Sequence, residues 1–214
     1  MKNKIIIILL IFIYCEAPAQ SKYNLKVIYS TTSQKNKNNS ESQDHEEMFL
    51  LMGENESFYM HPNKFIRDSI LLNLKEKKSN MQNMSQAQIQ NLVNNLPKTP
   101  NVPVKYAISK TKDSLIFTTK SALDTFIYFE KLPNFNWSIQ SEEKQLLGFT
   151  CSKARGSFRG REYIAWFTSE IPSPNGPHKF GGLPGLILEI HDTENHYTFK
   201  AKSHCVSCSR CSKY

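Results

Sequence analysis

The chain has 214 residues and a formal net charge of +8. A chain of this length can bury enough surface for one substantial core, so we expect a single folded domain. The lysines are scattered rather than aligned on one predicted element, so the positive charge favours solubility and we expect no nucleic-acid partner.

The first residues have the pattern of an export signal. Two lysines precede the apolar run Ile5–Ile13, and Ala17–Ala19 supplies small residues for cleavage. We therefore expect residues 1–19 to be a signal peptide and the protein to be exported, to the periplasm or the extracellular space. The apolar run is too short to span a bilayer, so no transmembrane helix is expected. Cys15 raises the alternative of a lipidated N-terminus, which the bulky Tyr14 before it disfavours.

The N-terminal part of the chain predicts strands around a polar loop. Residues 22–29 alternate apolar and polar side chains, which predicts a strand. Residues 31–47 are polar throughout and predict a loop. Residues 48–52 and 57–60 flank a short glycine-containing connection, which predicts a hairpin.

Helix signals follow in the next segment. Ser85 and Gln88 have the spacing of a capping box, apolar side chains then recur at helical spacing, and Pro97 ends the pattern. A second, less regular apolar pattern precedes them. We expect a helical insertion over residues 63–96 that packs on one side of a sheet.

The remaining sequence predicts further strands. They cover residues 104–109, 115–119, 125–130, 145–153, 160–168, 186–191 and 196–201. A turn is predicted at residues 155–157, between the fourth and fifth of these strands. Together the elements predict an α+β domain over residues 20–202: a curved antiparallel meander, similar to a half-barrel, with one or two helices packed on one side.

A proline and glycine motif follows the last long connection of the chain. Pro184 fits the second position of a type II turn, and Gly185 would take the positive φ that such a turn requires. The next residues have one strongly apolar face, which predicts a strand. The complete structural motif is Gly182, Leu183, Pro184, Gly185, Leu186 and Ile187.

Six residues near the predicted turn at 155–157 are candidates for ligand binding. If the two strands pair there, four cations and an aromatic ring lie close together, which fits an anion or a peptide carboxylate. Alternatively, the arginines pair with Glu162, Glu170 or Glu189 and hold the fold. The six candidates are Lys153, Arg155, Arg159, Arg161, Tyr163 and Trp166.

This part of the chain resembles the GLPGLI family, exported proteins known mainly from Bacteroidetes whose biochemical role is not established. The resemblance is carried by the segments 148–154, 158–167, 170–172, 176–177, 179–180 and 182–187. It implies a location and partners in the cell envelope, and it supplies no catalytic residue. The sequence departs from the family pattern after Lys202, so truncation of the sheet there is one expectation.

The C-terminal tail, residues 203–214, is atypically rich in cysteine. His204, Cys205, Cys208 and Cys211 have a spacing that fits zinc or an iron–sulfur cluster. In an exported chain such thiols tend to form disulfides, so we expect no metal and no cofactor, and a disulfide between Cys151 and one tail cysteine is favoured. The pairing stays open.

Two hypotheses about function follow from these observations. The first is a non-catalytic envelope protein that binds an apolar or peptide ligand or docks on an outer-membrane protein. The alternative is an envelope hydrolase or thiol-dependent enzyme with Cys151 as nucleophile and His178 or His191 as base. The sequence contains none of the common hydrolase, phosphate-loop or dinucleotide motifs, so we expect no catalytic residue. The oligomeric state is not determined by these patterns.

Overall fold

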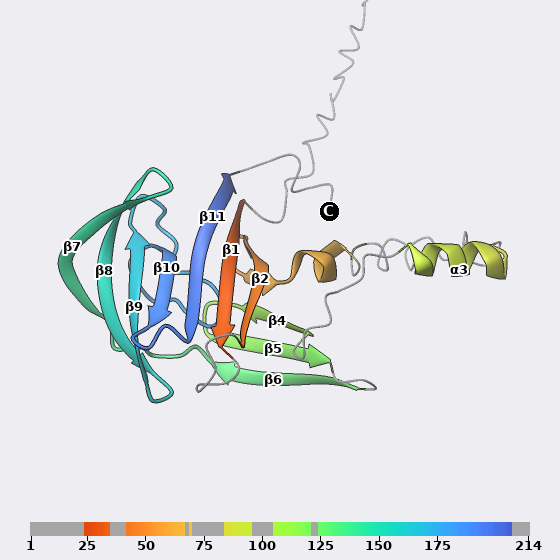
Figure 1. The fold of residues 1–214 in the computed structure, drawn as a ribbon, viewed down its shortest axis with the longest axis horizontal. Coiled ribbons are helices and arrows are strands. Elements are labelled where there is room, and N and C mark those ends of the chain that lie inside the picture. Colours follow the sequence, from red (N-terminus) through yellow and green to blue (C-terminus); the bar gives the residue numbers. More distant parts are fainter. Residues whose placement is uncertain are drawn as a thin grey trace, which may run out of the picture.

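The computed structural model describes residues 24–34, 42–66, 69, 84–95, 105–120 and 124–206. The labelled elements are β1 (Leu25–Gln34), β2 (Gln43–Met52), β3 (Ser57–Met60), α3 (Gln86–Asn94), β4 (Lys105–Lys110), β5 (Ser114–Lys120), β6 (Thr125–Lys131), β7 (Ser138–Leu146), β8 (Phe149–Phe158), β9 (Arg161–Thr168), β10 (Leu186–Asp192) and β11 (Tyr197–Val206) (Figure 1).

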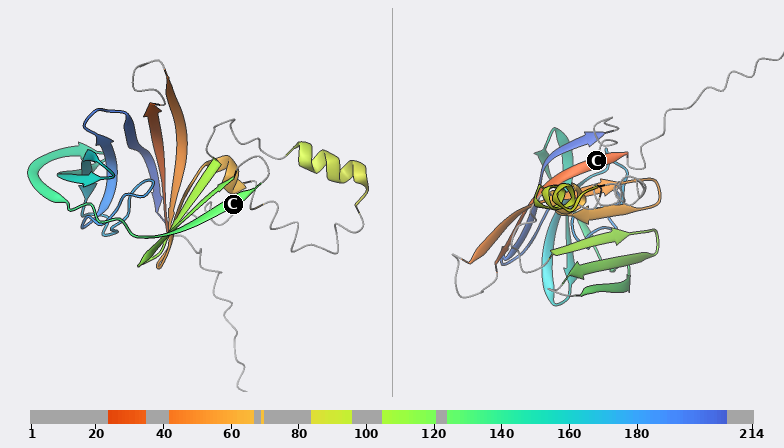
Figure 2. Two further views of the ribbon diagram at one scale, coloured as in Figure 1. Left: turned by 90° about the horizontal axis from the view of Figure 1, so that it is seen from below. Right: turned by 90° about the vertical axis from the view of Figure 1, so that its right-hand side faces the viewer.

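All eleven strands belong to one antiparallel sheet. Their order is β6-β5-β4-β3-β2-β1-β11-β10-β9-β8-β7, so two meanders are joined through the pair β1 and β11. The sheet is open and strongly curved (Figures 1 and 2). Because β6 and β7 lie at opposite edges, the segment 132–137 that connects them must pass from one edge to the other. The expected curved antiparallel sheet is confirmed, whereas the α+β label describes the fold only loosely.

The strands form because their alternating side chains bury one face. On β1, Val27 and Tyr29 have no exposed surface, and they lie opposite Leu50 and Met48 of β2. Lys26, between the two buried residues, points to the other face, where its ammonium lies over the ring of Phe49. Burying a large apolar side chain contributes about 1.5–3 kcal/mol. The concave face of the sheet therefore carries the core.

A loop, rather than a helix, covers the concave face. We call residues 171–185 the central loop. The ammonium of Lys110 on β4 donates to the carbonyl oxygens of Gly176 and Phe180, at 2.8 and 2.9 Å. The indole of Trp137 donates to the carbonyl of Gly181 at 2.9 Å. The loop is thus held by both halves of the sheet.

Helix α3 was expected to pack against the sheet, and this was wrong: Figure 1 and the left view of Figure 2 show it standing beyond the end formed by β4, β5 and β6. The central loop occupies the concave face of the sheet in its place. The capping box is confirmed, because Ser85 and Gln88 exchange hydrogen bonds of 2.9 and 3.3 Å. Much of the expected insertion, residues 63–96, lies outside the described residues. Within the described part of the chain, no helix is long and apolar enough to cross a membrane.

Two tight turns lie where none was predicted. Leu147 and Gly148 connect β7 to β8 with φ of 53° and 87°, and Arg159 and Gly160 connect β8 to β9 with φ of 49° and 78°. Two central residues with positive φ are typical of the type I′ hairpin turn. The strand expected over residues 145–153 therefore contains a turn.

The turn predicted at residues 155–157 was wrong, because Gly156 lies inside β8. A Cβ atom on Gly156 would lie 2.5 Å from the Trp137 ring and 2.7 Å from the Phe135 carbonyl oxygen. Gly156 is therefore needed for the close approach of the segment 132–137 and not for chain reversal.

Two further boundaries differ from the sequence expectation. β1 and β2 extend into the polar segment 31–47, with Gln34 paired to Gln43, because main-chain hydrogen bonds can continue a ladder that polar side chains line. β11 continues past Lys202 and pairs with the start of β1 as far as Val206. Residues 1–23 and 207–214 lie outside the described residues, so the signal peptide, Cys15 and most of the tail stay predictions.

The type II turn at Gly185 was also wrong. The positive φ of 82° is at Gly182, and Gly185 does not have a positive φ. Gly185 is instead fixed by a close approach, since a Cβ atom there would lie 2.1 Å from the carbonyl oxygen of Thr168. The glycine lets β10 start directly against the end of β9.

We predict that Gly185→Ala lowers the free energy of unfolding by about 1–3 kcal/mol, because the new methyl group meets rigid backbone. Gly148→Asn is the matched control: no atom lies within 4 Å of its Cβ position, and asparagine tolerates a positive φ better than most side chains do. Urea denaturation should show a clear loss for the first variant and a change below about 1 kcal/mol for the second. Equal midpoints would contradict the close approach of Gly185.

Candidate functional site

The central loop divides the concave side of the sheet into two cavities. The larger has a volume of about 630 Å³, and we call it the aromatic pocket. Its walls come from β1, β2, β4, β5, β11, the β8–β9 hairpin and the central loop. Six of the rings that line it are Tyr106, Phe117, Phe158, Tyr163, Phe180 and Phe199.

The rings of the aromatic pocket contact one another. Tyr106 and Phe117 are stacked at 5.4 Å between centroids, and Tyr163 lies 4.8 Å from Phe180. Phe180 in turn meets Phe199 edge to face at 5.7 Å. Such pairs contribute about 0.5–1.5 kcal/mol beyond their burial, so each wall is fixed by its neighbours. The pocket is therefore largely preformed.

His178 belongs to this aromatic wall. It has a φ of 50° at the tip of the central loop, and its ring meets Tyr106 edge to face at 5.6 Å. Burial lowers the pKa of His178 to about 3, and the charges of Lys179 and Lys110 act in the same direction. The imidazole is consequently neutral at physiological pH and behaves as a ring of the wall rather than as a cation.

Arg161, at the rim of the pocket, is held in an ion-pair network. Its guanidinium donates to the carboxylate of Asp192 at 2.6 Å and to that of Glu194 at 3.3 Å. Asp192 is 1% exposed and also accepts a hydrogen bond from the backbone N–H of Tyr197. Asp192, Glu194 and His196 could together hold a metal ion by their spacing. Because the Arg161 guanidinium already lies among these groups, the cluster is better explained as an ion-pair network.

A second set of ion pairs joins β6 to the opposite half of the molecule. The ammonium of Lys179 donates to Glu130 at 2.7 Å, and the guanidinium of Arg159 lies 3.2 Å from the same carboxylate. The hydrogen bond from Lys179 holds the pKa of the Glu130 carboxyl below its ordinary value. Glu130 therefore fastens the edge strand β6 to the central loop and to the β8–β9 turn.

The six candidate residues do not form one cluster. Gly156 pairs with Tyr163 and Phe158 pairs with Arg161, which places Tyr163 and Arg161 on the concave face. Lys153 pairs with Trp166, so these two residues lie on the convex face.

Arg155 also lies on the convex face, opposite Ile164, and only Arg159 stands in the turn itself. The expected group of four cations at residues 155–157 was therefore wrong. Arg159 and Arg161 do form ion pairs with carboxylates, as the alternative predicted. Their partners, however, are Glu130, Asp192 and Glu194. Whether any of the six residues binds a ligand stays a prediction.

On the convex face, Trp166 lies between two lysines. The ammonium of Lys144 lies 4.3 Å from the ring centroid, and that of Lys153 lies 5.9 Å away. Both lysines are also paired, with Glu189 at 3.0 Å and with Glu142 at 2.7 Å. Each pair has one partly buried member, since the side chains of Glu189 and Lys153 are 13% and 16% exposed, so these residues form a cluster of ion pairs and cation–π contacts on the convex face.

Cys151 is a buried thiol rather than an activated one. Its Sγ contacts the carbonyl oxygen of Phe149 at 3.8 Å, and burial raises its pKa to about 11. Within the described part of the chain no histidine hydrogen-bonds to it: His178 lies in the aromatic pocket, and His191 contacts the carbonyl of Asp192. A protonated thiol is a poor nucleophile, so these observations weigh against the hydrolase hypothesis. Cys151 is a free thiol in the structure, so the disulfide that was favoured between it and a tail cysteine is not formed there.

Sequence reasoning missed most of the pocket. The sequence placed Tyr106, Phe117 and Phe199 in three predicted strands, but it did not predict that their rings face the same cavity. Successive side chains of a strand point to opposite faces, so the strand assignments do place each ring on one side of its strand. Bringing the three sides together requires the order of strands in the sheet, which a single sequence does not supply.

We predict that His178 makes the protein acid-sensitive. Between pH 6.5 and about 3 the unfolded chain holds a proton on this histidine that the folded chain does not. The free energy of unfolding should therefore fall as the pH drops through this window, by up to about 1.4 kcal/mol per pH unit. His178→Asn, which tolerates the positive φ, should flatten the slope of urea midpoint against pH. The same slope in both proteins would contradict a neutral imidazole in the pocket wall.

Comparison with known proteins gives a family of unknown function and a fold. A family model described as a protein of unknown function (Porph_ging) matches residues 159–189, which cover β9, the central loop and the start of β10. A search of curated proteins finds no match. Two solved structures of PNGF-II, in two space groups, are similar to this chain with a TM-score of 0.55 and 12% identity. The match covers 86% of this chain and 28% of that protein, and at this identity it shows a similarity of fold alone.

Proposed function

We propose that this chain is a non-catalytic binding protein that takes an uncharged, largely apolar ligand in the aromatic pocket. The observation that carries the proposal is the cavity of about 630 Å³ walled by aromatic rings on the concave face. Small-molecule sites are typically concave and mostly apolar, with a few polar groups that fix orientation. The aromatic pocket meets each of these conditions.

The charges around the pocket favour an uncharged ligand. Arg161 and Lys179 lie at the rim, and both are engaged by carboxylates, Asp192 and Glu130. His178 is neutral in the wall. A charged ligand would have to displace these pairs and give up its own hydration, whereas moving apolar surface from water into the pocket is favourable.

Polar contacts to the ligand would come from hydroxyl groups. Burial raises the pKa of Tyr163 to about 12, and burial also raises the pKa of Tyr106. Both phenols are therefore protonated and can donate a hydrogen bond at physiological pH. A ligand with one carbonyl or hydroxyl group at the end of an apolar or aromatic body suits this arrangement.

We place this activity in the cell envelope. The export signal over residues 1–19 and the resemblance to an exported family support that location. In that location, an outer-membrane protein is the kind of partner that we expect.

The proposal predicts that a bulky side chain at Ser33 blocks binding. Ser33 lines the pocket from β1. Ser33→Trp should weaken the binding of N-phenyl-1-naphthylamine, a neutral apolar fluorophore, by about ten-fold or more, because the indole fills the cavity.

Ser30→Trp is the matched control, since Ser30 lies on the same strand but on the other face. It should bind the fluorophore as the unchanged protein does. Equal loss in both variants, or no binding to the unchanged protein, would contradict the proposal.

A further inference from the structure

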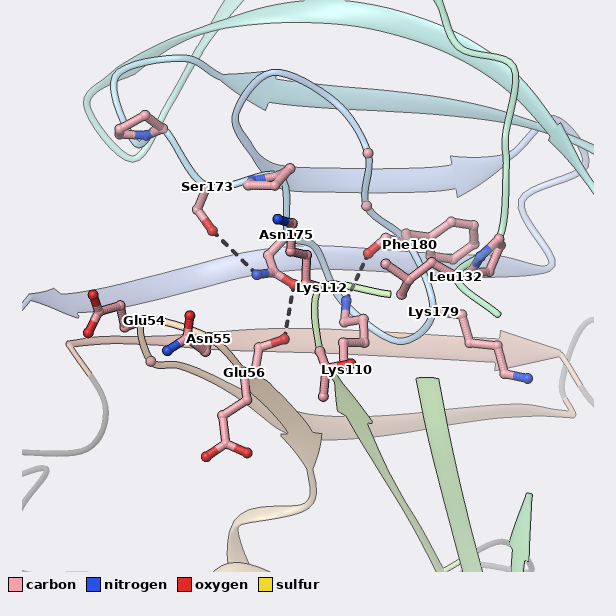
Figure 3. A pocket seen from close by; sticks show the side chains of 18 of the residues that line it. Glu54, Asn55, Glu56, Lys110, Lys112, Leu132, Ser173, Asn175, Lys179 and Phe180 are labelled. Carbon is pink, nitrogen blue, oxygen red and sulfur yellow. Dashed lines mark hydrogen bonds between the residues drawn. The ribbon is translucent and has the colours of Figure 1, made fainter. Parts of the chain in front are cut away.

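The second cavity contains a buried cation. Lys110 is 5% exposed, and its ammonium is turned toward the central loop (Figure 3). It donates to the carbonyl oxygens of Gly176 and Phe180 at 2.8 and 2.9 Å. An ammonium has three N–H groups, so one of them is not used by these two bonds.

No carboxylate of the described residues pairs with Lys110. The two carbonyl groups accept hydrogen bonds but carry no full charge, so the positive charge is solvated without being neutralised. Removing a charge from water without a counter-charge is costly. Burial accordingly lowers the pKa of Lys110 to about 7. The site therefore offers one N–H donor and an unbalanced positive charge.

The space beside this ammonium is large enough for a small molecule. The cavity has a volume of about 480 Å³ and lies between the β2–β3 turn, the end of β4, the segment after β6 and the central loop. One part of the lining is apolar, with Leu132, Pro133 and Pro174. Another part is polar, since the hydroxyl of Ser57 donates to the side-chain oxygen of Asn175 at 3.0 Å.

We propose that this cavity binds a small monocarboxylate, with one carboxylate oxygen accepting the third N–H of Lys110 and the apolar body lying against Leu132 and Pro133. Charge-assisted hydrogen bonds of this kind are short and strong. The site is separate from the aromatic pocket, so it goes beyond the proposed function, and either can fail without the other.

The surrounding charges favour a single negative charge. Glu54 and Glu56 line the mouth of the cavity and oppose a multiply charged anion such as phosphate. Lys112 is exposed at the same mouth. From the central loop, the Lys179 ammonium is engaged by Glu130 and the His178 ring is neutral. Lys110 is thus the buried cation that a carboxylate entering this cavity meets.

The test is calorimetric titration of the full chain with hexanoate, with hexanamide as an uncharged ligand of similar shape. Hexanoate should bind at pH 6.5, and hexanamide should bind at least about ten-fold more weakly. Lys110→Met keeps the length of the side chain and removes the charge, and it should weaken hexanoate by about ten-fold or more. Lys112→Met, the matched control at the mouth, should change the affinity by less than about three-fold, because that lysine is exposed.

A second measurement uses the unchanged protein. At pH 8, above the pKa of Lys110, binding of hexanoate should be coupled to uptake of a proton by the Lys110 amine, and titrations in two buffers of different ionisation enthalpy report this uptake. The proposal is overturned if hexanoate does not bind, if it binds Lys110→Met as tightly as the unchanged protein, or if no proton is taken up. The measurement of proton uptake tests the proposal even if the Lys110→Met variant does not fold.

Discussion

The structure depends on how an open, curved sheet covers its concave face with a loop. A helix satisfies its own main-chain groups, whereas a loop placed over a core needs donors for its buried carbonyls. Here the donors come from distant parts of the chain: Lys110 binds the carbonyls of Gly176 and Phe180, and Trp137 binds that of Gly181. The flexible side chain of Lys110 reaches two carbonyls that lie four residues apart in the loop. The buried ammonium is the consequence of filling the core with a loop.

The same constraint explains the path of the chain between the two meanders. The segment 132–137 must travel between opposite edges of the sheet, and it does so against the central loop. Phe135 is buried between Phe158 and Phe180, at 5.1 and 5.4 Å. Gly156 makes room for this segment on β8. Loop and segment therefore support each other, and the two cavities are the spaces that they leave on either side.

Local signals predicted the helix cap and about half of the strands, but they missed β7 and the outer parts of β1 and β2. Alternation located the strands from β4 to β6 and the hairpin of β10 and β11, and the capping box located the start of α3. The turns were harder, because Leu147 and Arg159 take a positive φ that is usual for asparagine or glycine. A turn misplaced by a few residues changes which side chains share a face, and this is why six candidate residues expected together were found on two faces.

No local sequence pattern could predict which residues donate hydrogen bonds to the carbonyls of the central loop. The segment matched by the family model, residues 159–189, contains the central loop and its carbonyls, but Lys110 and Trp137 lie outside it. The matched segment thus contains a loop whose carbonyls need hydrogen-bond donors, but it does not contain those donors. Because two of the three N–H groups of Lys110 hold the loop, a ligand oxygen can use the third without releasing it. The structural and binding roles of this lysine are therefore compatible, and each added acceptor makes burial of its charge less costly.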